Sequence, residues 1–510
     1  MEHEPLEGSD RLLMTLALAA ASFMVILDTS IANVSIPGIS GDLAVSPSQG
    51  TWVITSFAVS NAIAVPLTGW LARRIGEVRL FSLSMLLFSI ASLGCGLSNS
   101  MTMLIAFRVL QGAVAGPMMP LSQTLLLGIY PQEKRGMALA IWAMTTLVAP
   151  VTGPILGGWI TDNLRWPWIF YINVPIGIVC TYLIWARLRE RESRIVKLPI
   201  DTMGLVLLAL GVGSLQVMLD KGGELDWFNS STIVALAVVA VLCLTLLVAW
   251  ELTEEHPVID LSLFKRRNFT SAAIAVSLAY VIFFGTIVLL PLWLQTQMSY
   301  TPTWAGLVMA PTGLLAIVIT PIIGRNMHRL DPRMLASFGF LVFAVTAFMR
   351  ARFEPSADFV TLALPQLVQG IAVACFFVPL TSIALSGLPV QQIASASGLF
   401  NFLRILAGGV GTSVATTVWE RREALHHAQL TEQITAYSPA ASQYLSQLQA
   451  NGSDPAASLA IIDRLIGGQA YSMATADMSW IAAWIFIALV PLLWLARPPF
   501  GSRAAAPAAE

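Results

Sequence analysis

Charged side chains are scarce in this sequence, because Asp, Glu, Lys and Arg together make up only 11% of its 510 residues. An average soluble domain carries about 25%. Hydrophobic residues reach 56% and the mean hydropathy is +0.74, so we expect many membrane crossings rather than one soluble core. The net charge of −1 and the lack of a basic patch give no support for a nucleic-acid partner.

Catalytic and cofactor-binding motifs are absent as well. The sequence has no Walker motif, GxGxxG loop, Ser/His/Asp arrangement or zinc spacing, so we expect neither an ATPase nor another enzyme. Its four cysteines lie in apolar stretches without disulfide or metal spacing. The neighbouring His426 and His427 cannot easily share one ion. We therefore expect no metal and no cofactor.

Fourteen apolar segments are long enough to cross a bilayer, which takes about 20 residues. Each has to be helical, since only a helix satisfies its own backbone in lipid. The predicted spans are 12–36, 50–71, 79–98, 101–129, 137–161, 167–187, 202–220, 231–250, 270–295, 303–324, 333–351, 359–387, 391–419 and 476–496.

The basic residues between these spans predict their orientation. One side of the predicted membrane holds 19 Lys and Arg residues, termini included, and the other side holds 7. The remaining two, Arg108 and Arg404, lie inside spans. Because cytoplasmic loops are enriched in Lys and Arg, we expect both termini in the cytoplasm.

Two parts of the sequence repeat. Arg108-Val-Leu-Gln111-Gly112 matches Gln366-Leu-Val-Gln369-Gly370, and Pro66-Leu-Thr-Gly69 matches Pro321-Ile-Ile-Gly324. We therefore expect two related six-helix halves, which is typical of transporters that rock two halves about a central site. The predicted organisation is a first half at 1–198, an inserted helix pair at 199–260, a second half at 261–497 with a long periplasmic loop at 420–475, and a cytoplasmic tail at 498–510.

Asp28 lies alone in the first apolar span. A charged side chain at mid-membrane costs at least about 2.5–3.5 kcal/mol unless it is paired or faces water, and Arg108 is the suitable partner. A nearby cation favours the charged carboxylate while burial disfavours it. We interpret Asp28 as a group that takes up and releases protons, with Arg108 tuning it. The alternative is a structural salt bridge that never titrates.

Other side chains within the spans are candidates for lining a substrate cavity, although each of them also fits a helix–helix contact. Arg404 has two open interpretations, contact with substrate or stabilisation of the second half. A cavity with fixed cations disfavours cationic ligands, so we expect neutral, weakly acidic or amphipathic ones. The candidates are Asn33, Asn61, Gln111, Gln123, Tyr280, Phe283, Phe284, Gln369, Asn401 and Arg404.

Four motifs resemble those of the major facilitator superfamily. They lie at Leu27–Pro37, Gly69–Arg79, Arg108–Gly112 and Ala149–Gly158. With fourteen spans, the set is similar to the drug:proton antiporter branch. Segments 50–57, 172–177 and 261–265 are similar to EmrB-type multidrug exporters. The resemblance covers nearly the whole chain.

The resemblance implies an all-α major facilitator fold in a bacterial inner membrane, and proton-coupled export of hydrophobic toxic compounds. EmrB-type pumps work with a periplasmic membrane-fusion adaptor and an outer-membrane channel, so it implies these partners too. The polar segment 420–475 is either the docking surface for such a partner or a solvated, partly helical extension. A proton-linked metabolite transporter and a non-transporting membrane sensor or scaffold stay open as alternatives.

The resemblance also assigns gating roles. In the family, the glycines and prolines of the fifth span form part of a hinge, and the Gly69–Arg79 loop is a latch between the halves. Here Arg73 replaces the usual acid of that latch, which leaves Glu77 as a candidate substitute. The residues assigned to gating are Gly69, Arg73, Arg74, Gly76, Pro150, Gly153, Pro154, Gly157 and Gly158.

Overall fold

The computed structural model describes residues 5–500 apart from 46, 51, 194, 197, 198, 200, 224, 256, 258, 328, 435–437, 452, 453 and 499. Within this part the chain is helical and contains no strand, which confirms the predicted all-α fold. The first half comprises α1 (Gly8–Asp42), α2 (Pro47–Gly50), α3 (Trp52–Ala64), α4 (Thr68–Ile75), α5 (Glu77–Gly96), α6 (Met101–Ala115), α7 (Met118–Ile129), α8 (Arg135–Asn163), α9 (Trp168–Tyr171) and α10 (Asn173–Leu188).

The inserted pair and the second half follow in the predicted order. The pair is α11 (Thr202–Lys221) and α12 (Ser231–Glu251). The second half comprises α13 (Arg267–Thr296), α14 (Pro302–Asn326), α15 (Pro332–Arg350), α16 (Phe359–Ala384), α17 (Val390–Gln433), α18 (Pro439–Ala450) and α19 (Pro455–Leu493).

Twelve described helices are long and apolar enough to cross a membrane, and α3 with α4 makes a thirteenth if the bent pair is one span. These two helices meet at an angle of 62°. The break falls around Pro66, whose ring removes a backbone donor and disfavours a continuous helix. Helix α8 is 29 residues long, but part of it is described by its backbone only. The count of fourteen spans and their direction stay predictions.

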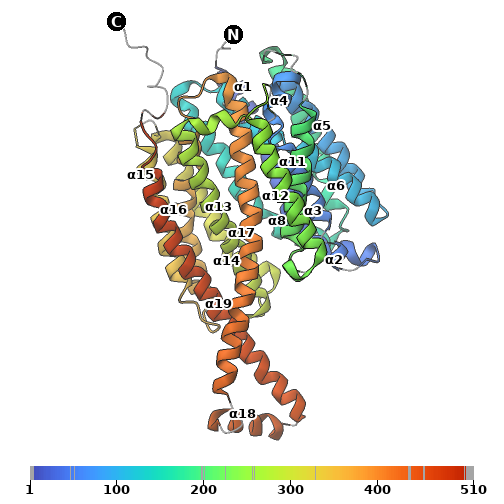
Figure 1. Cartoon of the computed structure of the whole chain (residues 1–510), viewed down its shortest axis with the longest axis vertical. Helices are drawn as coiled ribbons and strands as arrows, with labels where there is room; N and C mark the ends of the chain where they lie inside the picture. The colour runs from blue at the N-terminus through green and yellow to red at the C-terminus, as the bar shows by residue number, and fades with distance from the viewer. Residues whose placement is uncertain are drawn as a thin grey trace.

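The two halves stand side by side in one bundle (Figure 1), and they meet along α8 with α14 and along α4 and α7 with α17. Helix α11 of the inserted pair packs on both α3 and α17, so it touches both halves. We call the end of the bundle that carries Arg73, Lys134, Arg266 and Arg333 the basic end. Both ends of the described chain lie there, and the opposite end carries a helical protrusion.

That protrusion is helical in residues 420–433, 439–450 and 455–475, where the sequence left open a solvated loop, a partly helical extension or a docking surface. Helix α17 runs on for 44 residues, and α19 begins at Pro455 rather than near 476. At 1.5 Å per residue, α17 spans roughly 66 Å, about twice the hydrocarbon core of a bilayer. The two helices leave the bundle together and α18 joins them at the tip (Figure 1). We call this part, residues 420–475, the hairpin. Its first part continues α17 as a helix because no Gly or Pro interrupts residues 420–433.

Glycines allow the halves to approach closely at the basic end. A Cβ on Gly136 of α8 would lie 2.7 Å from the backbone oxygen of Gly324 in α14. A Cβ on Gly69 of α4 would lie 2.8 Å from the Cα of Ser395 in α17. No real Cβ tolerates such distances from a backbone, so these crossings depend on glycine. The structure is therefore closed between the halves at its basic end.

Candidate functional site

Asp28 lies within α1 with 2% of its surface exposed. Its Oδ2 accepts a hydrogen bond of 2.5 Å from Nη1 of Arg108 in α6, and the two form a salt bridge in which both side chains are buried. The structure thus brings together the two residues that the sequence marked for proton coupling, across 80 positions of chain. Both side chains of this pair are therefore withdrawn from the molecular surface.

The guanidinium of Arg108 has further partners that hold it in place. Its Nε donates to the backbone oxygen of Val53 at 2.8 Å, and Nη1 also donates to Oε1 of Gln111 at 2.8 Å. The ring of Phe57 lies under it, 4.3 Å from the guanidinium carbon. Its Nη2 has no partner in the part of the chain that the structure describes. Arg108 is therefore bound by three elements and keeps one donor free.

Amide side chains complete the surroundings of Asp28. Oδ1 accepts from Nδ2 of Asn173 at 2.8 Å and from Nε2 of Gln111 at 3.1 Å. Both amide nitrogens also contact Oγ of Ser92, at 3.0 and 3.2 Å. Charged acceptors in a low-dielectric interior gain strongly from such donors. Helices α1, α5, α6 and α10 each contribute one part of this site, which we call the Asp28 site.

Sequence reasoning missed two members of the Asp28 site and placed a third elsewhere. Asn173 and Ser92 read as ordinary polar residues in apolar spans. Gln111 was a candidate for the substrate cavity, but the structure places it between Arg108 and Asp28. The signal that existed was its spacing: Gln111 lies one helical turn after Arg108 and so on the same face.

A second polar cluster joins the two halves. Oε1 of Gln123 in α7 accepts from Oγ of Ser397 at 2.5 Å and from Nδ2 of Asn401 at 3.1 Å, both in α17. All three side chains are buried. Nε2 of Gln123 and Oδ1 of Asn401 have no partner among the described residues. Buried unpaired polar atoms are costly, so this cluster carries one unused donor and one unused acceptor at the interface between the halves.

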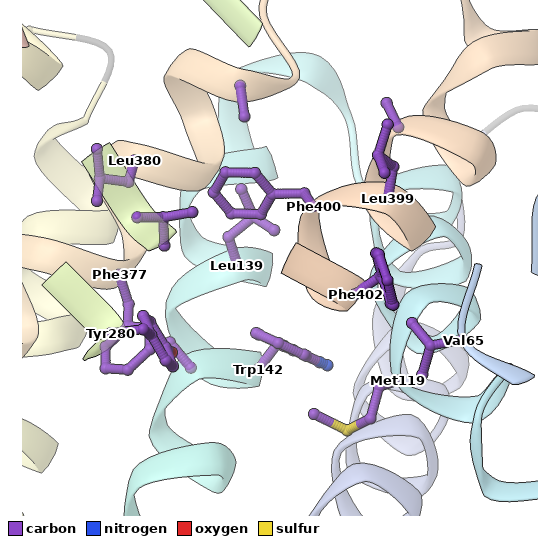
Figure 2. Close-up of a cluster of buried hydrophobic side chains, with 14 of the residues drawn as sticks. Val65, Met119, Leu139, Trp142, Tyr280, Phe377, Leu380, Leu399, Phe400 and Phe402 are labelled. Atoms are coloured by element: carbon purple, nitrogen blue, oxygen red, sulfur yellow. The ribbon is translucent and has the colours of Figure 1, made fainter. Parts of the chain in front are cut away.

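Arg404 lies one helical turn beyond Asn401 and is enclosed by aromatic rings. Its guanidinium carbon is 5.5 Å from the ring of Trp142 in α8 and 5.5 Å from that of Tyr280 in α13. Only 7% of Arg404 is exposed, and no described carboxylate lies within ion-pair distance of it. Figure 2 shows Trp142 and Tyr280 on facing sides of the interface, with Phe377, Phe400 and Leu139 around them. The site is a buried cation without an acid, set in an apolar wall.

The remaining cavity candidates do not form one cluster. Phe283 and Phe284 pack around Tyr280 with ring centroids 6.1 and 5.4 Å away, and Phe284 is 37% exposed. Gln369 is buried with its Oε1 unpartnered among described residues. Asn61 lies apart from this wall and donates to the backbone oxygen of Gly112 at 3.4 Å, between α3 and α6. The side chain of Asn33 lies outside the described residues.

The Gly69–Arg79 loop is held by Glu192, a residue that the sequence did not indicate. The two carboxylate oxygens of Glu192 accept from the backbone N–H groups of Val78 and Arg79 at 3.0 and 2.9 Å, which caps the start of α5. Gly76 has φ +100° and leaves room for that carboxylate, because a Cβ there would lie 2.5 Å from Oε1. Glu192 therefore brings a second carboxylate to this loop beside Glu77, and the role of Glu77 in a latch stays a prediction.

The predicted gating arginines contact the neighbouring chain through a backbone hydrogen bond and a ring contact. The backbone oxygen of Arg73 accepts from N–H of Val196 at 2.8 Å, and Arg74 lies over the ring of Trp70. The segment after α10 is therefore bonded to the Gly69–Arg79 loop through Glu192 and Val196. The gating role of Arg73 stays a prediction.

The fifth-span motif brings α8 against α1 next to Asp28. A Cβ on Gly153 would lie 3.1 Å from the backbone carbon of Ser30, and one on Gly157 would lie 3.1 Å from the backbone oxygen of Ile31. The side chains of Pro150 and Pro154, and the surroundings of Gly158, lie outside the described residues. The helix that carries Asp28 is therefore in backbone contact with the helix that reaches the other half.

Comparison with known proteins places these features in a family. The model of the Major Facilitator Superfamily matches residues 18–412. The chain is 55% identical to the multidrug export protein EmrB of Haemophilus influenzae over 500 residues, covering 98% of both chains. It is 49% identical to the fatty acid resistance protein FarB of Neisseria gonorrhoeae over 502 residues, covering 98% of this chain and 99% of FarB. The solved human organic anion transporter MFSD10 shares the fold, with a TM-score of 0.59 at 13% identity, over 94% of this chain and all of that one.

These matches settle the class of the protein. It is a transporter rather than an enzyme, and its apolar helices make it a multi-pass protein of the inner membrane. The chain belongs to the Major Facilitator Superfamily, among the multidrug efflux transporters of the EmrB type.

Proposed function

We propose that this transporter exports hydrophobic and weakly acidic compounds in exchange for protons, with Asp28 as the proton carrier. The observation that carries the proposal is the Asp28 site. A carboxylate that is 2% exposed and joined to Arg108 at 2.5 Å is neutralised either by its partner or by a proton. A proton arriving at Asp28 removes the charge that holds Arg108.

The effect of that proton reaches the interface between the halves through α8. Helix α8 touches α1 at Gly153 and Gly157 and touches α14 at Gly136. If Arg108 turns away from a neutral Asp28, it keeps Val53 and Gln111 as acceptors, and the hydrogen bond from Gln111 is what still joins Asp28 of α1 to α6. A more weakly held α1 changes its packing on α8, and α8 changes the fit between halves. Proton binding thereby biases the two orientations of the transporter.

The compounds carried are expected to bind at the Arg404 wall. A buried guanidinium without a described carboxylate favours an anionic head group, and the rings of Trp142 and Tyr280 favour an apolar body. The name of the relative FarB, a fatty acid resistance protein, is consistent with this chemistry. The basic end faces the cytoplasm by the distribution of Lys and Arg, so export runs toward the hairpin.

The hairpin is the proposed contact for partner proteins. It leaves the bundle on the side opposite to the basic end, and Leu425, Leu459 and Leu465 are exposed on its helices. Helical surfaces of this kind pack against other helices. We propose that a periplasmic membrane-fusion adaptor binds here and connects the transporter to an outer-membrane channel.

Drug-driven proton release in inside-out vesicles tests the proton role. A pH gradient is set up, a lipophilic weak acid or a neutral hydrophobic drug is added, and the lumenal pH is followed. Wild-type protein should dissipate the gradient, and Asp28→Asn should not, at matched expression. The control is Asp463→Asn, which removes an exposed hairpin carboxylate bonded to His427 and should leave dissipation unchanged.

Two outcomes would contradict the proposal. Dissipation that persists in Asp28→Asn would place the proton site elsewhere. No dissipation by the wild type across a broad panel of compounds, with adaptor present, would favour a sensor or scaffold over a transporter.

A further inference from the structure

A small cavity lies in the second half between α13, α15 and α19, toward the hairpin. Its volume is about 20 Å³, which is room for one particle of water size or slightly larger. Arg350, the last residue of α15, lines it together with the hydroxyl groups of Thr286, Thr475 and Ser479. The cavity therefore combines one fixed cation with a few polar groups.

Arg350 is buried without a described acid. Only 7% of it is exposed, and no described carboxylate lies within ion-pair distance. Its Nη2 donates to Oε1 of Gln366 at 2.9 Å, while its Nε has no partner among the described residues. Because a guanidinium can only donate, the oxygen of Gln366 has to face it, and this leaves Nε2 of Gln366 unpartnered too. Both unused groups are donors.

The internal repeat relates the cavity beside Arg350 to the Asp28 site. Gln366 is the sequence counterpart of Arg108 in the repeated motif. By the order of the halves, α13, α15, α16 and α19 correspond to α1, α5, α6 and α10, the helices that build the Asp28 site. The first half holds both an acid and an arginine. The second half has its arginine on the α5 counterpart, and Thr286 rather than an acid on the α1 counterpart.

We propose that this cavity binds a small inorganic anion, of the size and charge of chloride, as the counter-ion of Arg350. Burying an unpaired cation is costly, and a water molecule supplies no charge to offset it. The hydroxyl groups of Thr286 and Ser479 now donate to helical carbonyls at 2.9 and 2.8 Å. Those carbonyls belong to helices and already accept backbone N–H groups, so both hydroxyls are able to turn toward an anion. The anion joins three helices of the second half.

Thermal unfolding of the detergent-solubilised full chain tests the proposal, with chloride replaced by gluconate at constant ionic strength. Gluconate is too large for the cavity. The transition temperature of the wild type should rise with the logarithm of chloride concentration, as expected for a ligand that binds the folded state. Arg350→Gln should abolish the rise. The matched control Arg352→Gln alters an exposed arginine two residues away and should retain it.

Two further measurements distinguish a loss of anion binding from poor folding of the Arg350→Gln variant. Thr286→Asp supplies the missing acid on the α1 counterpart, so it should fold and lose the dependence on chloride. Crystals of the wild type grown in bromide should show anomalous density in the cavity beside Arg350. A transition temperature that is equal in chloride and gluconate, or a bromide map without a peak there, would show that only water fills the cavity and would overturn the proposal.

Discussion

Replacing Gly69 by alanine should push the transporter away from the conformation closed at the basic end. The added Cβ would lie 2.8 Å from the Cα of Ser395, so α4 and α17 have to separate before the side chain fits. Ser395 meets Gly69 with its backbone, which cannot yield as the end of a flexible side chain does. This steric conflict exists only while the two halves touch.

The size of the effect follows from the cost of overpacking. An extra methyl group in a well-packed contact costs about 1–3 kcal/mol, which corresponds to a change of roughly 5–150-fold in a two-state equilibrium. Because the open conformation does not pay this cost, the ratio of open to closed conformations rises by that factor. Substrate export should slow, since the cycle has to pass through the closed state.

Distances between spin labels measure this shift directly. Labels at Glu190→Cys and Met334→Cys lie on exposed positions near the basic end in different halves, in a background with Cys243→Ser, since the other three cysteines are buried. Gly69→Ala should shift the distance distribution to longer values. Gly128→Ala, where a Cβ meets nothing within 4 Å, serves as the control. An unchanged distribution in Gly69→Ala would refute the idea that this contact closes the basic end.

Two further substitutions test the Arg404 wall and the Glu192 cap. Arg404→Gln should weaken binding of a lipophilic carboxylic acid by roughly 10–150-fold, because a charge-assisted hydrogen bond contributes about 1.5–3 kcal/mol. A neutral dye of similar size should keep its affinity. Equal losses of affinity for both compounds would point to a structural role. Glu192→Ala removes the acceptor for two N–H groups at the start of α5, and the loss of a helix cap should lower the unfolding free energy by about 0.5–2 kcal/mol. Thermal unfolding checks this against Glu190→Ala, an exposed acid two residues away, and an unchanged transition temperature would mean that the cap contributes nothing.

Much of the fold was predictable from the sequence because lipid leaves few choices. In lipid, a run of about 20 apolar residues without an acid or a base has to be helical, and each predicted span overlaps one or more helices of the described chain, with the span at 50–71 divided between α3 and α4. The hairpin was harder to predict. Polarity alone separates residues 420–475 from the membrane but does not distinguish a loop from a helix that continues into water.

The candidate site was predictable only for its charged members. Asp28 and Arg108 are conspicuous because ionised side chains are rare in apolar spans. Asn173 and Ser92 were missed because neutral polar residues occur in such spans for many packing reasons. Glu192 was missed because a charged residue in a basic loop has no distinguishing pattern before its backbone partners are known.

The sequence by itself indicated the membrane-spanning helices and the repeat within the chain, and it singled out one acid, Asp28, and two arginines, Arg108 and Arg404, inside the spans. Those properties follow from composition and local order along the chain. Only the tertiary structure decided which buried polar groups meet, because Asp28 bonds Arg108 across 80 positions and Asn173 across 145. Contacts at such separations depend on how helices are arranged around one another, and among the described residues that arrangement gives Arg350 and Arg404 no acid partner.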